Sequence, residues 1–213
     1  MVLKLYGMRE ATCTQRVLAT LAELGVTDFE LIKINLYEQE QKQPSYLALQ
    51  PWGKLPLLDD DGYLVYESRA ICKYLALKFH EKNKTLMPSL DDLKAYGQFE
   101  QACSIELSYF EVPAFGLWFE QFIKPMRGFG ATDEAIVNQH LTSLDTNLAV
   151  YEKILSKQKY LAGDEFTLAD LYHLPHGVKA APLKLQAVID KYPHVADWFQ
   201  RIQERDSWKQ SVV

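Results

Sequence analysis

The stretch from Gln50 to Tyr74 contains residues whose types and spacing could bind a peptide-like ligand. Pro56 lies in a short apolar run, and proline cannot donate to a strand ladder, so it is typical of a strand start, an edge or a bulge. A strand that starts at Pro56 leaves the backbone groups of Leu55 outside the ladder, where an extended peptide could pair with them. The same residues also fit an ordinary hairpin strand, so both interpretations remain open.

A helix start is the second feature of this stretch. Asp60-Asp61-Gly62 is typical of a hairpin turn, Tyr63–Tyr66 is expected to form the strand after it, and Glu67-Ser68 then begin a helix. The expected buried stripe of that helix is Ala70, Ile71, Tyr74 and Leu75. The first N–H groups of a helix lack partners within it and carry the positive end of its dipole, which favours a carboxylate. A capped helix with no ligand is the alternative.

The two halves of the stretch, QPWGKLP and YESRAICKYL, resemble the glutathione-binding half of cytosolic glutathione transferases at that family's spacing. The resemblance implies a cis bond between Leu55 and Pro56, with the Leu55 backbone paired to the cysteinyl part of glutathione. It implies that Glu67 and Ser68 bind the γ-glutamyl end. The positions that it assigns to the glycine carboxylate are Gln41, Lys42 and Lys54, each of which could instead be a plain surface residue.

Other segments extend the resemblance along nearly the whole chain. The sequences MVLKLYG, EQKQPSYL and YLAGDEFTLADLYHLP are similar to the phi class in particular, and the likeness is loosest from Gln98 to Gly130. The resemblance implies an enzyme of detoxification that uses glutathione as co-substrate. It would conjugate the thiol to small hydrophobic electrophiles and could also reduce peroxides. It also implies a homodimer.

The loop Ala11-Thr12-Cys13-Thr14 departs from the phi-class pattern, which reads broadly Ser-Thr-Cys-Thr with the serine donating to the glutathione thiolate. Ala11 occupies the serine position and has no hydroxyl. Thr12 is one candidate for the missing donor, and helix capping is its alternative role. Cys13 is a second candidate, because a helix N-terminus favours a thiolate that can form a mixed disulfide with glutathione. Its alternative is a small buried apolar residue.

Three functions follow from this departure. The first is a glutathione transferase, with activity reduced if nothing replaces the serine. The others are a weakly catalytic or non-catalytic glutathione-dependent protein that binds hydrophobic ligands (a ligandin), and a thiol transferase acting through Cys13. An aromatic-rich stretch is expected to line a hydrophobic pocket for the second substrate, although most of it could be core: Tyr109, Phe110, Phe115, Trp118 and Phe119.

Composition excludes several other classes. The chain has 213 residues, 48% hydrophobic and 24% charged, and a net charge of −5 without a basic block, so nucleic acid and anionic membrane surfaces are poor partners. No apolar segment approaches the length of a membrane span. Three widely spaced cysteines argue against a disulfide framework and for a reducing, cytoplasmic location. His173 and His176 lack further ligands at suitable spacing, so no metal site is expected.

The order of the predicted elements gives the fold class. An α/β thioredoxin-like domain is expected over residues 1–80, and an all-α domain over 90–213. The first domain would begin with a strand over 2–6 and a helix that Thr12 or Thr14 caps, followed by a strand over 29–34.

The second domain is predicted from helical periodicity. A helix from Leu90 to about Phe122 would be interrupted at Pro113. Thr167 to Asp170 form a capping box, flanked by Phe166 and Leu171 as a hydrophobic staple. Spacings of four and three predict an amphipathic helix with inward residues Val137, Leu141, Leu144, Leu148, Tyr151 and Leu155. The last helix would start at Pro193 and bury Val195, Trp198, Phe199 and Ile202.

Overall fold

The structure is a computed structural model that describes residues 3–212, so Val2, where the first strand was predicted to begin, lies outside the described residues. The chain divides into two compact units, one running to Met87 and resuming at Asp206, the other comprising Pro88–Arg205. The segment after Asp206 was predicted to belong to the helical domain, but it packs with the first unit. Its helix α12 (Asp206–Ser211) lies against α1 (Thr12–Glu23) and buries Trp208.

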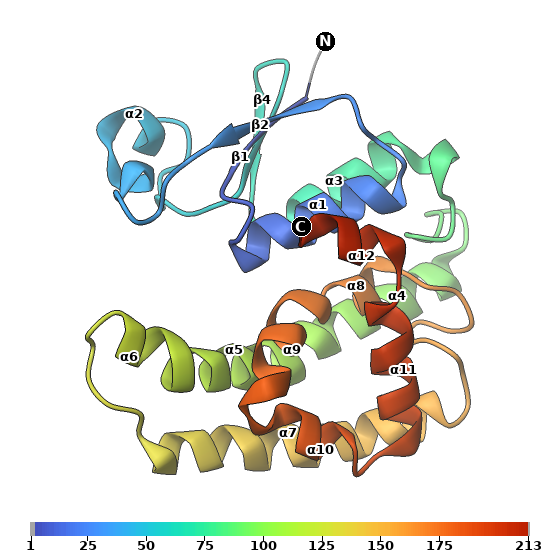
Figure 1. Ribbon diagram of the computed structural model, residues 1–213. Helices are drawn as coiled ribbons and strands as arrows, with labels where there is room; N and C mark the ends of the chain where they lie inside the picture. The colour runs from blue at the N-terminus through green and yellow to red at the C-terminus, as the bar shows by residue number, and fades with distance from the viewer. Residues whose placement is uncertain (1–2, 213) are drawn as a thin grey trace. The chain divides into compact units, whose positions relative to one another are not determined.

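Within residues 3–87 the described strands form a four-stranded mixed sheet in the order β2-β1-β3-β4 (Figure 1). The strands are β1 (Leu3–Gly7), β2 (Phe29–Lys33), β3 (Leu57–Asp60) and β4 (Tyr63–Tyr66). β1 runs parallel to β2 and antiparallel to β3, which pairs antiparallel with β4. Along β1, Leu3 and Leu5 are buried and Lys4 is exposed, which is the alternation expected of a strand with one face on the core.

The register brings the end of β1, the start of β3 and the end of β4 to one edge of the sheet. Leu57, the first residue of β3, pairs with Tyr6 near the end of β1 and with Tyr66 at the end of β4. β1 and β4 therefore point the same way, and the loops that leave them begin beside the loop that enters β3. We call this the β1/β4 carboxyl edge, defined by Gly7, Leu57 and Tyr66.

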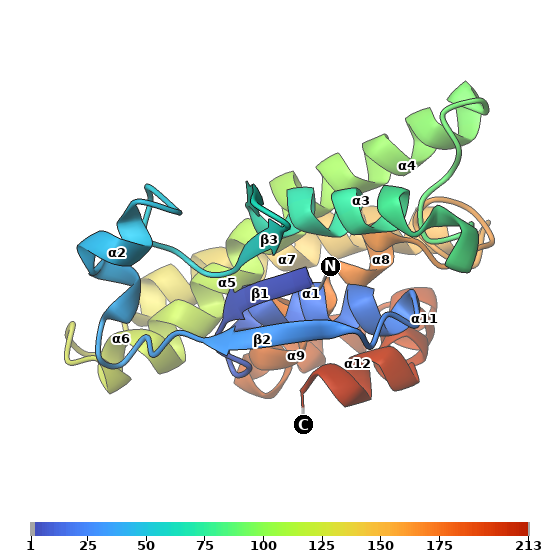
Figure 2. The same cartoon turned by 90° about the horizontal axis from the view of Figure 1, so that it is seen from above.

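Two helices begin just beyond that edge. α1 follows β1, α3 (Ser68–Lys78) follows β4, and the two lie side by side on one face of the sheet (Figures 1 and 2). The N-cap of α1 is Ala11, so the prediction that Thr12 or Thr14 caps this helix was wrong. The remaining helix of the unit is α2 (Pro44–Leu47), with short 3-10 turns at Glu40–Lys42 and His80–Lys82.

The buried stripe of α3 differs slightly from the prediction. Ile71 and Leu75 are buried as expected, but Ala70 is exposed and Tyr74 is only partly covered. Cys72 and Ala76 are buried in their place, because α3 packs against both α1 and the sheet and so turns a second row of small side chains inward.

The second unit is helical. Its first helices are α4 (Leu93–Ile105), α5 (Val112–Trp118), α6 (Lys124–Met126) and the long α7 (Glu134–Leu155). They are followed by α8 (Leu168–Leu171), α9 (Leu174–Ala180), α10 (Gln186–Ile189) and α11 (Pro193–Gln203). α7 buries the predicted residues except Leu141, which is half-buried, and α11 starts at Pro193 and buries its four predicted residues.

Pro113 does not interrupt the first of these helices, contrary to the prediction. The segment from α4 to α6 keeps helical dihedral angles and forms one continuous path beside α7 (Figure 1). The turn before Pro113, Glu106–Glu111, is π-helical, as is Phe119–Ile123 after α5. A wide turn has one residue more than an α-turn, which makes room for the pyrrolidine ring, and the Tyr109 carbonyl, four residues before Pro113, accepts from the Asn147 side-chain amide at 2.7 Å.

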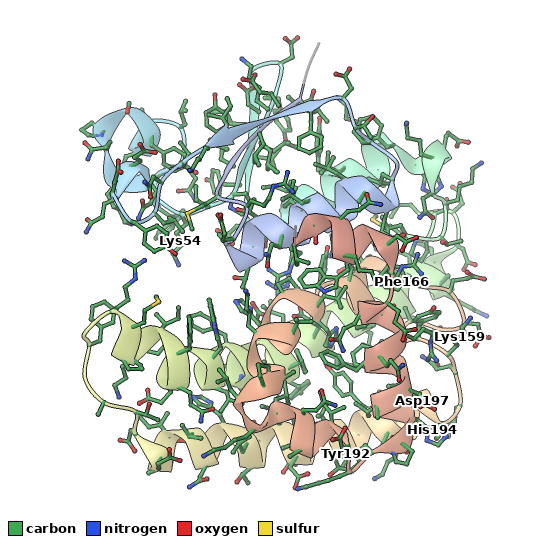
Figure 3. All side chains as sticks on the ribbon, in the orientation of Figure 1. Lys54, Lys159, Phe166, Tyr192, His194 and Asp197 are labelled. Carbon is green, nitrogen blue, oxygen red and sulfur yellow. The ribbon has the colours of Figure 1, made fainter. Side chains whose placement is uncertain are left out.

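The predicted capping box at α8 is confirmed. Thr167 accepts from the Ala169 N–H, and the buried Asp170 carboxylate accepts from the Thr167 N–H at 3.1 Å. Asp170 also accepts from the Leu161 N–H at 3.0 Å and the Trp198 indole at 2.9 Å. Burial raises the pKa of Asp170, and these donors offset that cost. Phe166 (labelled in Figure 3) and Leu171 are both buried beside the box.

Candidate functional site

The loop before β3 presents an unpaired backbone, as the sequence suggested. The Leu55–Pro56 peptide bond is cis, which confirms the expectation from the resemblance. β3 begins two residues after Leu55, and among the described residues the Leu55 backbone makes no hydrogen bond. Its N–H and C=O are therefore available to an extended peptide at the β1/β4 carboxyl edge.

The side chains of Tyr46 in α2 and of Gln50 hold this loop in place. The Tyr46 hydroxyl donates to the Lys54 carbonyl at 2.8 Å, and the Lys54 N–H donates to the Gln50 side-chain oxygen at 3.4 Å. Burial raises the pKa of Tyr46 far above its usual value, so the phenol stays neutral and remains a donor. The Lys54 ammonium is left exposed at the surface of the loop (Figure 3).

The other two residues expected near the glycine carboxylate contact the same loop. The Lys42 ammonium donates to the Trp52 carbonyl at 3.1 Å. Gly53 has a φ of +56°, and a Cβ there would lie 2.7 Å from the Gln41 carbonyl oxygen and 2.9 Å from the Lys42 nitrogen, so this close approach requires glycine. Gln41 is half-buried, and its side-chain oxygen has no partner among the described residues. Two ammonium groups and one amide thus gather around the loop.

The start of α3 supplies the next pair of predicted residues. Glu67 is the N-cap, is exposed and has a φ of +70°, a conformation that non-glycine residues adopt rarely. Ser68 is buried, and its Oγ accepts a hydrogen bond at 2.9 Å from the Arg16 guanidinium. Arg16 is fully buried on α1, and the same nitrogen lies 3.6 Å from the Cys13 sulfur.

Sequence reasoning missed Arg16. Its apolar neighbours Val17 and Leu18 gave no signal, because successive residues of a helix point about 100° apart, so the position alone does not place the guanidinium in the core.

The N-terminus of α1 lies at the same edge. Ala11 gives the helix no side-chain cap, and the N–H groups of Cys13 and Thr14 have no acceptor among the described residues. Thr12 is buried at the first helical position, and Cys13 is half-exposed. The two candidate donors from the sequence, the Thr12 hydroxyl and the Cys13 thiol, therefore lie within one helical turn of these backbone N–H groups.

Cys72 differs from Cys13 in burial and is a structural cysteine. Its side chain is fully buried, its sulfur donates to the Arg16 carbonyl at 3.7 Å, and burial raises the pKa of the thiol to about 11. It is therefore protonated at neutral pH, whereas Cys13 is accessible at a helix N-terminus.

The predicted aromatic residues are not all brought together. The rings of Trp118 and Phe119 lie 6.2 and 6.0 Å from that of Phe115, which is 43% exposed. Phe110 is buried against Tyr151 and belongs to the core.

Tyr109 lies elsewhere. It is 53% exposed and lines a separate cavity with Ile105, Asn147, Val150 and Tyr151. We call Phe115, Trp118 and Phe119 the aromatic cluster.

The histidines near it belong to hydrogen-bonded networks. His176 Nδ1 lies 2.9 Å from a Glu111 carboxylate oxygen, and His173 bonds to the Ala169 carbonyl and to the Tyr151 hydroxyl. In the part of the chain that the structure describes, no three His, Cys, Asp or Glu side chains gather as a metal site, and no helix is long and apolar enough to cross a bilayer.

Comparison with known proteins decides the family. Residues 1–77 match the model of the glutathione S-transferase N-terminal domain, and residues 107–206 match that of the C-terminal domain. The glutathione S-transferase hmp2 of Hypomyces subiculosus is 47% identical over 208 residues, which covers 98% of this chain and 96% of that protein. The chain belongs to the glutathione S-transferase family.

Solved structures of this family agree with the fold. Glutathione transferase F7 from Populus trichocarpa superposes with a TM-score of 0.93 at 36% identity, covering 99% of this chain and 97% of that one. Glutathione S-transferase I from maize, described in complex with an atrazine glutathione conjugate, superposes with a TM-score of 0.88 at 35% identity, covering 100% and 97%. The phi-class resemblance is thereby confirmed, and this transferase uses glutathione as its co-substrate.

Proposed function

We propose that this transferase binds glutathione along the β1/β4 carboxyl edge and conjugates its thiol to small hydrophobic electrophiles. The observation that carries the proposal is the convergence at one edge of the unpaired Leu55 backbone, the Ser68 hydroxyl and the N-terminus of α1. An extended tripeptide with two carboxylates and a central thiol has partners for each of these groups. The maize relative in complex with a glutathione conjugate supports the reaction class.

Each end of glutathione would contact a different part of the edge. Glu67 and Ser68 would bind the ammonium and carboxylate of the γ-glutamyl end, and the N-terminus of α3 would add its dipole. Leu55 would pair with the cysteinyl backbone. The glycine carboxylate would lie near the cluster that Gln41, Lys42 and Lys54 form.

The thiol would lie at the N-terminus of α1. Conjugation needs the thiolate, and the Thr12 hydroxyl with the N–H groups of Cys13 and Thr14 would stabilise it. Ala11 occupies the N-cap position without a hydroxyl, so we expect a smaller thiolate fraction than a serine there would give. The same thiolate would reduce peroxides.

The aromatic cluster of the second unit would bind the apolar part of the electrophile. Its partly exposed rings pack on one another and on the His176 ring, which lies against Phe115 and Trp118, and together they offer an apolar surface. This surface fits small hydrophobic molecules better than charged ones.

Calorimetric titration with glutathione tests the binding assignment. Ser68→Ala should weaken the affinity by about tenfold to a hundredfold, since a hydrogen bond to a charged group contributes roughly 1.5–3 kcal/mol. Ser45→Ala, at an exposed position of α2, is the control and should bind like the wild type. Undiminished affinity of Ser68→Ala would refute the assignment. Glutathione binding without turnover of a generic electrophile would favour the ligand-binding alternative.

Thiol transfer through Cys13 is a second candidate, favoured by the Arg16 nitrogen 3.6 Å from the Cys13 sulfur. In that reaction the Cys13 thiolate would attack a mixed disulfide, retain the glutathionyl sulfur and release the other thiol. Cys13→Ser should then abolish deglutathionylation. If conjugation is the main activity, the same variant keeps most of its turnover.

We further propose a homodimer in the cytoplasm. The 68% exposed Trp52 ring supports a protein partner for the first unit, and no disulfide joins the three cysteines. Sedimentation velocity of the wild type and of Trp52→Ala would test the assembly, with a shift toward monomer expected in the variant.

A further inference from the structure

Arg16 is a fully buried cation whose side chain joins two helices. Its guanidinium nitrogen donates to the Ser68 Oγ at 2.9 Å across 52 residues of sequence, and so joins α1 to the first residue of α3. The backbone of the same residue is held by the Thr20 hydroxyl and the Cys72 thiol, which donate to its carbonyl at 2.9 and 3.7 Å. Both the backbone and the side chain of Arg16 are therefore tied to α1 and α3.

The direction of this hydrogen bond has a chemical consequence. A serine hydroxyl has one proton and two lone pairs, whereas a guanidinium only donates. When Arg16 donates to Ser68 Oγ, one lone pair is used and the hydroxyl proton cannot point at Arg16. The proton must point elsewhere, and among the described residues Ser68 Oγ has no second partner, so the hydroxyl can donate to a ligand at the first residue of α3.

We propose that Arg16 is a positioning residue that holds the Ser68 hydroxyl as a donor to the γ-glutamyl carboxylate of glutathione, and so makes that carboxylate a specificity determinant. The inference rests on the proposed function, because it takes Ser68 to contact that end of the ligand. The positive charge of Arg16 would also polarise the hydroxyl, since the hydrogen bond lies in a buried, low-dielectric environment.

A double-mutant cycle tests the inference. Arg16→Lys, Ser68→Ala and the double variant would be titrated with glutathione and with 4-aminobutyryl-cysteinyl-glycine, which lacks only the γ-glutamyl carboxylate. Arg16→Lys should weaken glutathione binding by about tenfold, the lower end expected for one charged hydrogen bond. It should leave the affinity for the analogue within about twofold of the wild type. The double variant should lose no more affinity for glutathione than Ser68→Ala alone.

Thr20→Val is the matched control. It removes a hydrogen bond to the Arg16 carbonyl on the same buried face of α1 without touching the guanidinium, so its glutathione affinity should stay within about twofold of the wild type. Equal weakening of both ligands by Arg16→Lys, or additive losses in the double variant, would overturn the inference. If Arg16→Lys does not fold, Arg16→Gln replaces it, and failure of both would assign Arg16 to the fold alone.

The outcomes separate the inference from the proposed function. If the wild type does not bind glutathione, or Ser68→Ala binds it undiminished, the proposed site fails. If Ser68→Ala weakens binding but Arg16→Lys shows no coupling to it, only the role of Arg16 fails.

Discussion

The β1/β4 carboxyl edge and the aromatic cluster are built on different principles. The edge uses backbone groups and short polar side chains at the ends of elements, and the strand register brings them together. The cluster uses large side chains from the middle of one continuous helix, whose π-helical turns set the face on which each ring lies. Positions at element ends follow from local sequence signals, whereas positions along a helix depend on its pitch.

This difference predicts which property a substitution in each region should alter. Changes at the edge should alter glutathione affinity or thiol ionisation. Changes in the framework of the helical unit should alter stability, and those in the aromatic cluster should alter the use of the second substrate.

The largest effect is expected for Asp170→Ala. The substitution leaves the N–H groups of Leu161 and Thr167 and the Trp198 indole buried without their acceptor. Each such donor costs about 1–3 kcal/mol, so the free energy of unfolding should fall by about 3 kcal/mol or more. Denaturant unfolding measures the change. Asp190→Ala, which removes an exposed acceptor of Gln186, should stay within about 0.5 kcal/mol. A loss as small as that of the control would contradict the role of Asp170.

Two glycines in the same unit should respond oppositely to alanine substitution, one losing and one gaining free energy of unfolding. A Cβ at Gly177 would lie 2.8 and 3.0 Å from ring atoms of Phe199 and 3.2 Å from Phe110, both fully buried, so Gly177→Ala should destabilise by about 1–3 kcal/mol. Gly97 lies in α4 with nothing within 4 Å of its Cβ position. Gly97→Ala should therefore stabilise by about 0.5–1 kcal/mol. Thermal unfolding of both variants measures the change in stability. A Gly177→Ala variant as stable as the wild type or more so would show that the core around Gly177 can expand.

The same contrast explains how far sequence reasoning reached. The hairpin turn, the capping box and Pro193 all mark element ends, so the hairpin of the sheet, the starts of α3, α8 and α11 and the position of Ser68 could be predicted, whereas the cap of α1 could not. Pro113 signalled a break, yet a π-helical turn absorbed it, because the packing of α5 against α7 outweighs the local preference.

The site was harder to predict in two places. Tyr109 and Phe115 were expected to line one pocket because both belong to one aromatic-rich stretch, but Tyr109 lines a cavity of its own beside Asn147. Arg16 could not be assigned at all, since its partner Ser68 lies 52 residues away and only the fold brings them together.

Stabilisation of the thiolate at the edge can be tested by substitutions around Ala11, which lacks a hydroxyl. Thr12→Ala should raise the pKa of the bound glutathione thiol by about one to two units and slow conjugation at neutral pH by about tenfold to a hundredfold. A raised pKa means less thiolate below it, so the deficit should disappear at alkaline pH. Thr14→Val is the control, because the Thr14 hydroxyl is buried without a partner and its loss costs no hydrogen bond. Thiolate absorbance against pH measures both.

Ala11→Ser sharpens this test. It should raise turnover only if the wild-type thiol is poorly ionised. If Thr12→Ala changes nothing while Ala11→Ser raises turnover strongly, Thr12 is not the donor and the wild type is a weak catalyst. A fully ionised thiol in the absence of both hydroxyls would instead assign the role to the backbone N–H groups of α1.

The smallest effects are expected in the aromatic cluster, where a partly exposed ring contributes about 0.5–1.5 kcal/mol. Trp118→Leu should raise KM for an apolar electrophile by several-fold and leave glutathione affinity unchanged. Tyr109→Leu is its partner variant, because Tyr109 lies in the same helical path but lines the cavity beside Asn147. It should change neither constant. The reverse result would mean that the electrophile contacts the Tyr109 face of the helix, that Trp118 is core, and that the π-helical turns present the opposite side of the segment to the substrate.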